Sequence, residues 1–178
     1  MNIRIRVATS QDRDETRDIY LESFPEGEVD LIAQLAGNLL SEESNPETVT
    51  LVAELDGEVA GHVAFSPVYA GGEDKCLGYI LAPLAVKPKY QKRGIGSKLV
   101  NGGITRLSER GINLFLVYGD PKYYGRFGFE AETASRFSPP YELQYPFGWL
   151  AMLRGPGGSS EHTTQISCVE PLRNPALW

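Results

Sequence analysis

A short basic segment that ends in two glycines carries the clearest chemical signal in the sequence. An apolar run at residues 81–86 is followed by residues 91–97, which read Gln-Lys-Arg-Gly-Ile-Gly-Ser and open a helical pattern. Glycine lets the backbone adopt a positive φ and approach a ligand closely. The free N–H groups at the start of a helix bind anions, and the helix dipole strengthens that binding. The segment therefore predicts a site for a pyrophosphate.

Two other phosphate-binding motifs do not fit this segment. The dinucleotide-binding fingerprint requires a third glycine, and its place is taken by Leu99. The P-loop requires a glycine five places before the glycine that precedes its lysine, and Gln91 stands five places before Gly96. From Gly94 and Gly96 alone, a glycine loop before an ordinary helix is an equally good interpretation.

Charge and length limit the classes of protein to consider. The 178 residues fit one domain, residues 1–178. The net charge of −6 argues against a nucleic-acid-binding surface. The only compact basic cluster is Lys87, Lys89, Lys92 and Arg93, which suits a single phosphorylated ligand and would otherwise be a solvated loop.

Cysteine usage and hydropathy exclude several further classes. The two cysteines, Cys76 and Cys168, form no disulfide framework, which makes the cytoplasm the expected compartment. Ligand spacing for zinc is absent, so no metal is expected. The N-terminus carries charges within its apolar run, unlike a signal peptide. No apolar run approaches the roughly 18 residues of a membrane span, so no membrane partner is expected.

The elements that position the loop follow from hydrophobic periodicity and turn signals. Strands are predicted at residues 3–7, 48–55, 58–69, 77–86, 113–118, 147–153 and 163–169, and helices at 9–24, 29–40, 94–110 and 121–126. The three strands between residues 48 and 86 should form an antiparallel meander, and a glycine-rich loop at 155–160 joins the last two strands. Gly102-Gly103 in the long helix predicts close backbone packing on the sheet. His62, in mid-strand, is expected to be packed or hydrogen-bonded.

The two chemical segments together resemble the GCN5-related N-acetyltransferase (GNAT) superfamily. Its signature, Gln/Arg-x-x-Gly-x-Gly/Ala, matches Gln91, Gly94 and Gly96, and residues 123–129 (YYGRFGF) resemble its tyrosine-x-x-apolar-Gly-Phe segment. The run that begins at Gly119 is closer still to a bacterial subgroup often called YhbS-like. The resemblance covers essentially the whole chain. It implies an α/β fold in the order β-α-α-β-β-β-α-β-α-β-β, with a central mixed, mostly antiparallel sheet of about seven strands and flanking helices.

The resemblance also implies acetyl-CoA as the cosubstrate. In this family the strand before the loop separates from its neighbour and offers backbone groups to the pantetheine arm, while the loop N–H groups hold the pyrophosphate. The positions that match these roles are Leu84, Ala85, Val86, Gln91, Lys92, Arg93, Gly94, Ile95, Gly96 and Ser97.

Acetyl transfer requires a neutral amine, a stabilised oxyanion and a proton for the departing thiolate. Tyr124 matches the family's tyrosine, and a phenol with a pKa near 10 is protonated at neutral pH and can act as a general acid. A carboxylate is absent from residues 79–86, where some family members carry a glutamate base. Glu22, Glu26 and Glu28 flank the break between the first two helices, and Glu28 is the preferred base, with water-relayed proton loss as an alternative.

The leading hypothesis is an enzyme that moves the acetyl group directly to an amine in a ternary complex. A coenzyme-A-binding module that senses or regulates without turnover is the alternative, and transfer of a longer acyl group is a third interpretation. The acceptor is expected to be a small-molecule amine or a peptide amine, and the acidic residues favour a cationic one. The sequence leaves a homodimer open.

Overall fold

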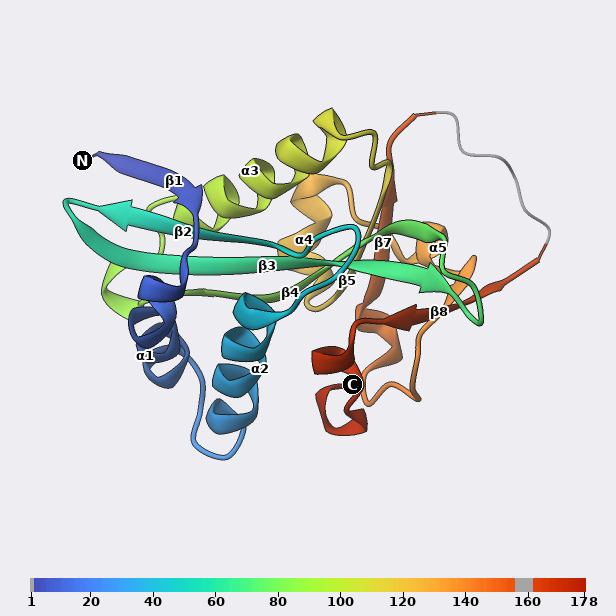
Figure 1. Ribbon diagram of the computed structural model, residues 1–178, viewed down its shortest axis with the longest axis horizontal. Helices are drawn as coiled ribbons and strands as arrows, with labels where there is room; N and C mark the ends of the chain where they lie inside the picture. The colour runs from blue at the N-terminus through green and yellow to red at the C-terminus, as the bar shows by residue number, and fades with distance from the viewer. Residues whose placement is uncertain (1, 156–161) are drawn as a thin grey trace.

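A twisted eight-stranded sheet forms the centre of the computed structural model, which describes residues 2–155 and 162–178 (Figure 1). Strands β1 to β5 and β7 follow in that order across the sheet, and β8 pairs with β3 and with β6. The strands are β1 Ile3–Val7, β2 Val49–Leu55, β3 Glu58–Ala70, β4 Cys76–Val86, β5 Leu114–Tyr118, β6 Phe137–Ser138, β7 Trp149–Leu153 and β8 Thr164–Cys168. The helices are α1 Arg13–Ser23, α2 Val29–Ser41, α3 Ile95–Glu109, α4 Pro121–Tyr124 and α5 Ala131–Ala134.

The sheet is covered on both faces because successive side chains of its strands point to opposite sides. Helix α3 lies on one face and helices α1 and α2 lie on the other (Figure 1). On β3, Val63 and Phe65 join the core under α3, while Ala64 and Val68 join a second core on the opposite face. This arrangement holds β4, which pairs with both β3 and β5, between two apolar layers.

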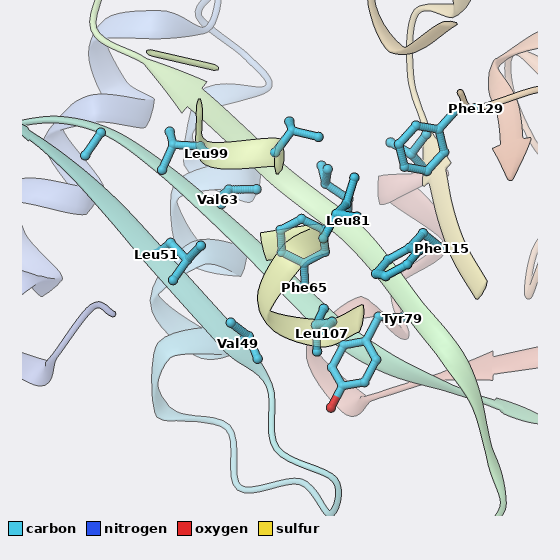
Figure 2. Close-up of a cluster of buried hydrophobic side chains, with 14 of the residues drawn as sticks. Val49, Leu51, Val63, Phe65, Tyr79, Leu81, Leu99, Leu107, Phe115 and Phe129 are labelled. Atoms are coloured by element: carbon cyan, nitrogen blue, oxygen red, sulfur yellow. The ribbon is translucent and has the colours of Figure 1, made fainter. Parts of the chain in front are cut away.

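Close packing of α3 explains one of its two central glycines. A Cβ atom at Gly103 would overlap the ring of Phe65, which lies in the middle of the core (Figure 2). A Cβ atom at Gly102 would have its nearest neighbours at 3.4 Å, close to ordinary contact distance. The predicted close approach of helix and sheet is therefore confirmed, with Gly103 as the residue that requires it.

The predicted elements are present, with boundaries that differ by a few residues. The meander β2–β3–β4 is antiparallel, as predicted, whereas β5 joins β4 in parallel. The prediction of seven strands misses β6, which has only two residues and is too short to show an alternating pattern. Helix α5 is missed for the same reason, since it has four residues. The predicted loop at 155–160 lies, beyond Gly155, outside the described residues.

His62 is a packed histidine, as predicted. Its side chain on β3 is fully buried, and the Tyr20 hydroxyl of α1 lies 2.8 Å from its Nδ1 atom. The other ring nitrogen, Nε2, has no hydrogen-bond partner among the described residues. Loss of hydration lowers the pKa of His62 to about 3, so the ring is neutral near pH 7.

This buried imidazole should make the protein sensitive to mild acid. The unfolded chain binds a proton near pH 6.5 and the folded chain does not, so the free energy of unfolding should fall as the pH decreases. The loss due to His62 should be about 1–2 kcal/mol between pH 6.5 and roughly pH 5. Urea denaturation across this pH range should show a flatter dependence for His62→Gln than for wild type. An identical pH dependence in the two proteins would contradict the assignment.

Candidate functional site

The site begins where β4 separates from β5. The parallel pairing of these strands covers Tyr79 to Leu81 of β4, and its last pair is Leu81 with Val117. On its other side β4 pairs with β3, where Leu81 lies opposite Phe65 and Leu84 lies opposite Val63. Three residue steps along β4 thus match two along β3, so β4 carries an extra residue at Ala82-Pro83. Such a bulge redirects a strand and increases its twist. Beyond Leu81, β4 stays paired with β3, but in the described structure no strand pairs with its opposite edge.

The backbone N–H and C=O groups of Leu84 and Val86 point toward this open edge. Lys87 donates its N–H to the carbonyl of Ala60 on β3, at 2.8 Å. Because backbone groups alternate along a strand, the polar groups of Val86 and Leu84 point to the other side. The Val86 carbonyl there accepts hydrogen bonds from Gln91 Nε2 at 3.0 Å and from Ser23 Oγ at 3.1 Å. The glutamine of the loop motif thus fastens the loop to the strand.

The loop between β4 and α3 has the backbone shape that its glycines predict. Gly94 adopts a left-handed conformation, with φ +80°, and is the N-cap residue of α3. Lys92 also has a positive φ, of 64°. The N–H groups at the start of α3 follow directly and form the kind of helix N-terminus that binds anions.

Part of the predicted basic cluster is engaged within the protein. Glu58 lies 3.0 Å from the Nζ atoms of both Lys87 and Lys89, and it accepts a hydrogen bond from the Tyr90 hydroxyl. These three groups lower the pKa of Glu58 to about 2, with the Tyr90 hydrogen bond as the largest cause. Lys87 and Lys89 therefore hold the base of the loop, and Lys92 is the lysine of the cluster that lines the adjacent cleft.

A cleft of about 500 Å³, the loop cleft, lies between the β4 edge, the loop and α4. It brings together the predicted coenzyme residues except Ala85 and Arg93. The side chain of Ala85 packs against α1 on the opposite face of the sheet, and the Arg93 guanidinium lies 5.7 Å from the centre of the Tyr90 ring. The lining residues are Leu84, Val86, Tyr90, Gln91, Lys92, Gly94, Ile95, Gly96, Ser97, Asp120, Tyr123, Tyr124 and Arg126.

Tyr123 lines the loop cleft, although the sequence analysis assigned it no role in the site. Its hydroxyl is hydrogen-bonded to the Ser97 side chain, and a Cβ atom at Gly96 would lie 2.5 Å from it. A side chain at position 96 would therefore have to displace the Tyr123 hydroxyl, whatever ligand is bound. The Arg126 guanidinium lies over the Tyr123 ring, 4.6 Å from its centre. Adjacent tyrosines and an arginine three residues later are a sequence signal, but only the fold places them against the loop.

Tyr124 occupies a different position from its neighbour. Its ring packs against Phe129 at 5.9 Å between centres and at a right angle to Tyr123 at 5.0 Å. A Cβ atom at Gly119 would lie 2.5 Å from its Cε2 atom, so the glycine provides space for the ring. Burial raises the pKa of Tyr124 well above that of an ordinary phenol, which keeps the hydroxyl protonated. No described residue is hydrogen-bonded to this hydroxyl.

A second cleft, the apolar cleft, has a volume of about 260 Å³ and lies between α1, α2, β4 and the C-terminal segment. Its lining residues are Phe24, Ile32, Leu35, Leu81, Ala82, Pro83, Leu84, Tyr118, Tyr124, Leu172, Leu177 and Trp178. Leu84 and Tyr124 line both clefts, so the clefts meet at these residues. Glu28 is exposed where α2 begins and lines neither cleft.

The separated strand and the helix N-terminus suit a phosphorylated ligand, and two adjoining clefts lie beside them. Residues 13–129 match the model of the acetyltransferase (GNAT) family. The chain is 32% identical over 176 residues to an uncharacterized N-acetyltransferase of Escherichia coli K12, YjhQ, covering 96% of this chain and 94% of that protein. The chain therefore belongs to the GNAT family of acetyltransferases, as the sequence motifs predicted.

Other relatives extend this assignment to solved structures. YhbS of Escherichia coli K12 is 48% identical over 85 residues, about half of each chain. The crystal structure of Escherichia coli YhbS in complex with CoA matches with a TM-score of 0.83 at 29% identity, covering 98% of this chain and 93% of that one. A Brucella melitensis GNAT acetyltransferase in complex with acetyl-CoA matches with a TM-score of 0.75, also at 29% identity, covering 96% and 97%. No helix among the described residues is long and apolar enough to cross a membrane.

The space that Gly119 provides for Tyr124 can be tested by a stability measurement. Gly119→Ala places a methyl group against the Tyr124 ring and should lower the free energy of unfolding by about 1–3 kcal/mol, as overpacking does. Gly125→Ala is the matched control because its Cβ would meet nothing within 4 Å and its φ of −57° suits alanine. The control should be neutral or more stable by up to about 1 kcal/mol. Equal effects in chemical denaturation would contradict this packing.

Proposed function

We propose that this chain transfers an acetyl group from acetyl-CoA directly to an amine while both substrates are bound. The observation that carries the proposal is the meeting of the two clefts at Leu84 and Tyr124. A donor in one cleft and an acceptor in the other would place their reacting atoms at the same point. Positioning of two reactants in this way removes much of the entropic cost of a bimolecular reaction.

The loop cleft suits the donor in two respects. The start of α3, at Gly94, Gly96 and Ser97, suits the pyrophosphate, because helix N-termini bind anions. The open edge of β4 at Leu84 and Val86 suits the amide groups of a pantetheine arm, which can pair with a free strand edge as a peptide does. Gln91 supports both parts by holding the loop against the Val86 carbonyl.

Acetyl-CoA supplies a thioester whose carbonyl carbon is attacked by a neutral amine as the carbon–sulfur bond breaks. An N–H group on the open edge of β4 stabilises the negative charge that develops on the carbonyl oxygen. The Tyr124 hydroxyl donates a hydrogen bond to the departing sulfur and passes it the proton, and the tyrosinate regains a proton, through water, from the nitrogen that has attacked. Burial of Tyr124 raises the pKa of the phenol, so stabilising the developing thiolate is the larger part of this role.

Removal of the proton from the amine is assigned to water and not to a carboxylate. Glu28, the base favoured by the sequence, is exposed outside both clefts. The lining of the apolar cleft contains no acidic residue, and Asp120 in the loop cleft accepts a hydrogen bond from the Lys122 backbone as the N-cap of α4. The acceptor class that this proposal requires is a small-molecule or peptide amine.

Coenzyme binding is the first test of the proposal. Coenzyme A at a hundred times its dissociation constant should increase the free energy of unfolding by about 2.7 kcal/mol. Gly96→Asp should abolish most of this effect, because it places a side chain and a negative charge at the start of α3. Gly37→Asp is the control, since Gly37 lies on α2 outside the loop cleft and a Cβ atom there would have its nearest neighbour at 3.9 Å. No thermal shift of wild type with millimolar coenzyme A would rule out the loop cleft as the donor site.

Tyr124→Phe tests the catalytic assignment. The variant keeps the ring packing and removes only the hydroxyl, so turnover should fall by roughly 10²- to 10³-fold while the coenzyme A shift is retained. Tyr69→Phe is the control, because its hydroxyl donates a hydrogen bond to the Asn45 carbonyl, away from both clefts. Wild-type activity should rise with pH as the amine loses its proton, with no fall from Tyr124 ionisation near pH 10, since the pKa of Tyr124 is raised. Full activity of Tyr124→Phe would refute the role.

Turnover itself separates the enzyme from the regulatory alternative. Release of free thiol from acetyl-CoA should depend on the amine and produce an equal amount of acetylated amine. Coenzyme A binding without thiol release for any amine in a broad screen would favour a sensor or regulatory module.

A further inference from the structure

The geometry points to an acceptor that carries its amine on an apolar body about the size of one aromatic ring. This inference rests on the proposed function, because it assigns the substrate class of the same site. It is drawn from the chemistry and the polar groups of the apolar cleft.

The walls of the apolar cleft contain no side chain that is charged at neutral pH. Phe24, Ile32 and Leu35 form the side given by the first two helices, and Leu172 and Leu177 belong to the opposite, C-terminal side. A cationic or anionic group in this space would lose its hydration without an ionic partner, which is strongly unfavourable. An apolar group would gain from the same burial.

The polar side-chain atoms of the cleft are already engaged, with one exception. The Tyr118 hydroxyl accepts a hydrogen bond from the Tyr145 N–H at 2.7 Å. The Trp178 indole donates to the Leu172 carbonyl at 3.0 Å. Among the described side chains that line the cleft, this leaves the Tyr124 hydroxyl without a hydrogen bond, at the junction with the loop cleft. A ligand that fits this pattern has a single polar group, which lies at the junction, and an apolar remainder.

Two of the aromatic rings that line the cleft, Tyr118 and Trp178, are stacked on each other. Tyr118 and Trp178 lie 6.1 Å apart between ring centres with an angle of 8° between their planes. Trp178 is in turn held edge-on by Trp149 at 6.0 Å. An aromatic group in the cleft can make offset-stacked or edge-to-face contacts with these rings, which add to the gain from its buried area, so the cleft favours a planar apolar group.

The same surroundings explain how the amine becomes a nucleophile without a carboxylate base. An ammonium group transferred to an apolar environment has a lowered pKa, because burial disfavours the charged form. The cleft therefore selects the neutral amine, and its proton leaves to water during binding. Glu22, Glu26 and Glu28, which favoured a cationic acceptor, are exposed and line neither cleft.

The closing experiment compares three primary amines as acceptors and as ligands. 2-Phenylethylamine has an apolar ring, ethanolamine lacks it, and 1,4-diaminobutane carries a second cation. With acetyl-CoA, kcat/KM for 2-phenylethylamine should exceed that of the other two by about 10- to 100-fold, as burial of a ring implies. In the presence of coenzyme A, only 2-phenylethylamine should add a further thermal shift.

Variants assign the preference to the apolar cleft. Ala82→Leu extends a side chain into the cleft and should reduce the ratio of kcat/KM for 2-phenylethylamine to that for ethanolamine by about tenfold. Ala131→Leu is the matched control at an exposed position of α5 and should keep the wild-type ratio. Ile32→Phe, on the α2 wall, replaces Ala82→Leu if the latter does not fold or lacks the coenzyme A shift.

The outcomes separate this inference from the proposed function. Absence of thiol release with every amine contradicts the function itself. If kcat/KM for ethanolamine or 1,4-diaminobutane equals or exceeds that for 2-phenylethylamine, the acceptor class is wrong and the function stands. The same holds if the ratio of kcat/KM for 2-phenylethylamine to that for ethanolamine is unchanged in both cleft variants. A preference for hexanoyl-CoA over acetyl-CoA that Ala82→Leu removes would assign the cleft to the acyl chain and also overturn the inference.

Discussion

The parallel pairing of β4 with β5 ends at Leu81 and Val117, and the arrangement of the site depends on this early end. If β5 continued alongside β4, it would occupy the edge that Leu84 and Val86 now expose, and neither cleft would reach the strand backbone. The bulge at Ala82-Pro83 redirects β4 at this point, and proline has no N–H to offer a neighbouring strand. The opening is therefore maintained by the backbone of the sheet and not by a mobile loop.

The two tyrosines of α4 divide the site between them. Consecutive residues of a helix point about 100° apart, so Tyr123 extends to the start of α3 while Tyr124 lies at the junction of the clefts. A glycine lies against each tyrosine: Gly96 of α3 against the Tyr123 hydroxyl, and Gly119, between β5 and α4, against the Tyr124 ring. The pairing of a large ring with a missing side chain fixes both phenols without a covalent or ionic link.

Local patterns in the sequence predicted the parts of the structure that depend on local rules. The alternating strands and the backbone of the loop from Gln91 to Ser97 appear as predicted because periodicity and turn chemistry act over a few residues. The part that Glu58 plays at the base of the loop could not be predicted, since it comes from a strand about 30 residues earlier in the chain. The apolar cleft could not be predicted from the sequence either, because Phe24, Pro83 and Trp178 come together only through the tertiary fold. The position of Glu28, exposed outside both clefts, likewise follows from the tertiary fold.

The three contacts of Glu58 also bear on how an anion approaches the loop. Screening limits electrostatic attraction to about 8 Å at physiological ionic strength, and Glu58 balances part of the charge of Lys87 and Lys89. A protein of net charge −6 repels an anion at longer range. What remains attractive is short-ranged and comes from the oriented backbone dipoles at the start of α3 together with Lys92 and Arg126, which line the loop cleft. Capture of a phosphorylated ligand should therefore tolerate salt, in contrast to a surface that depends on clustered lysines.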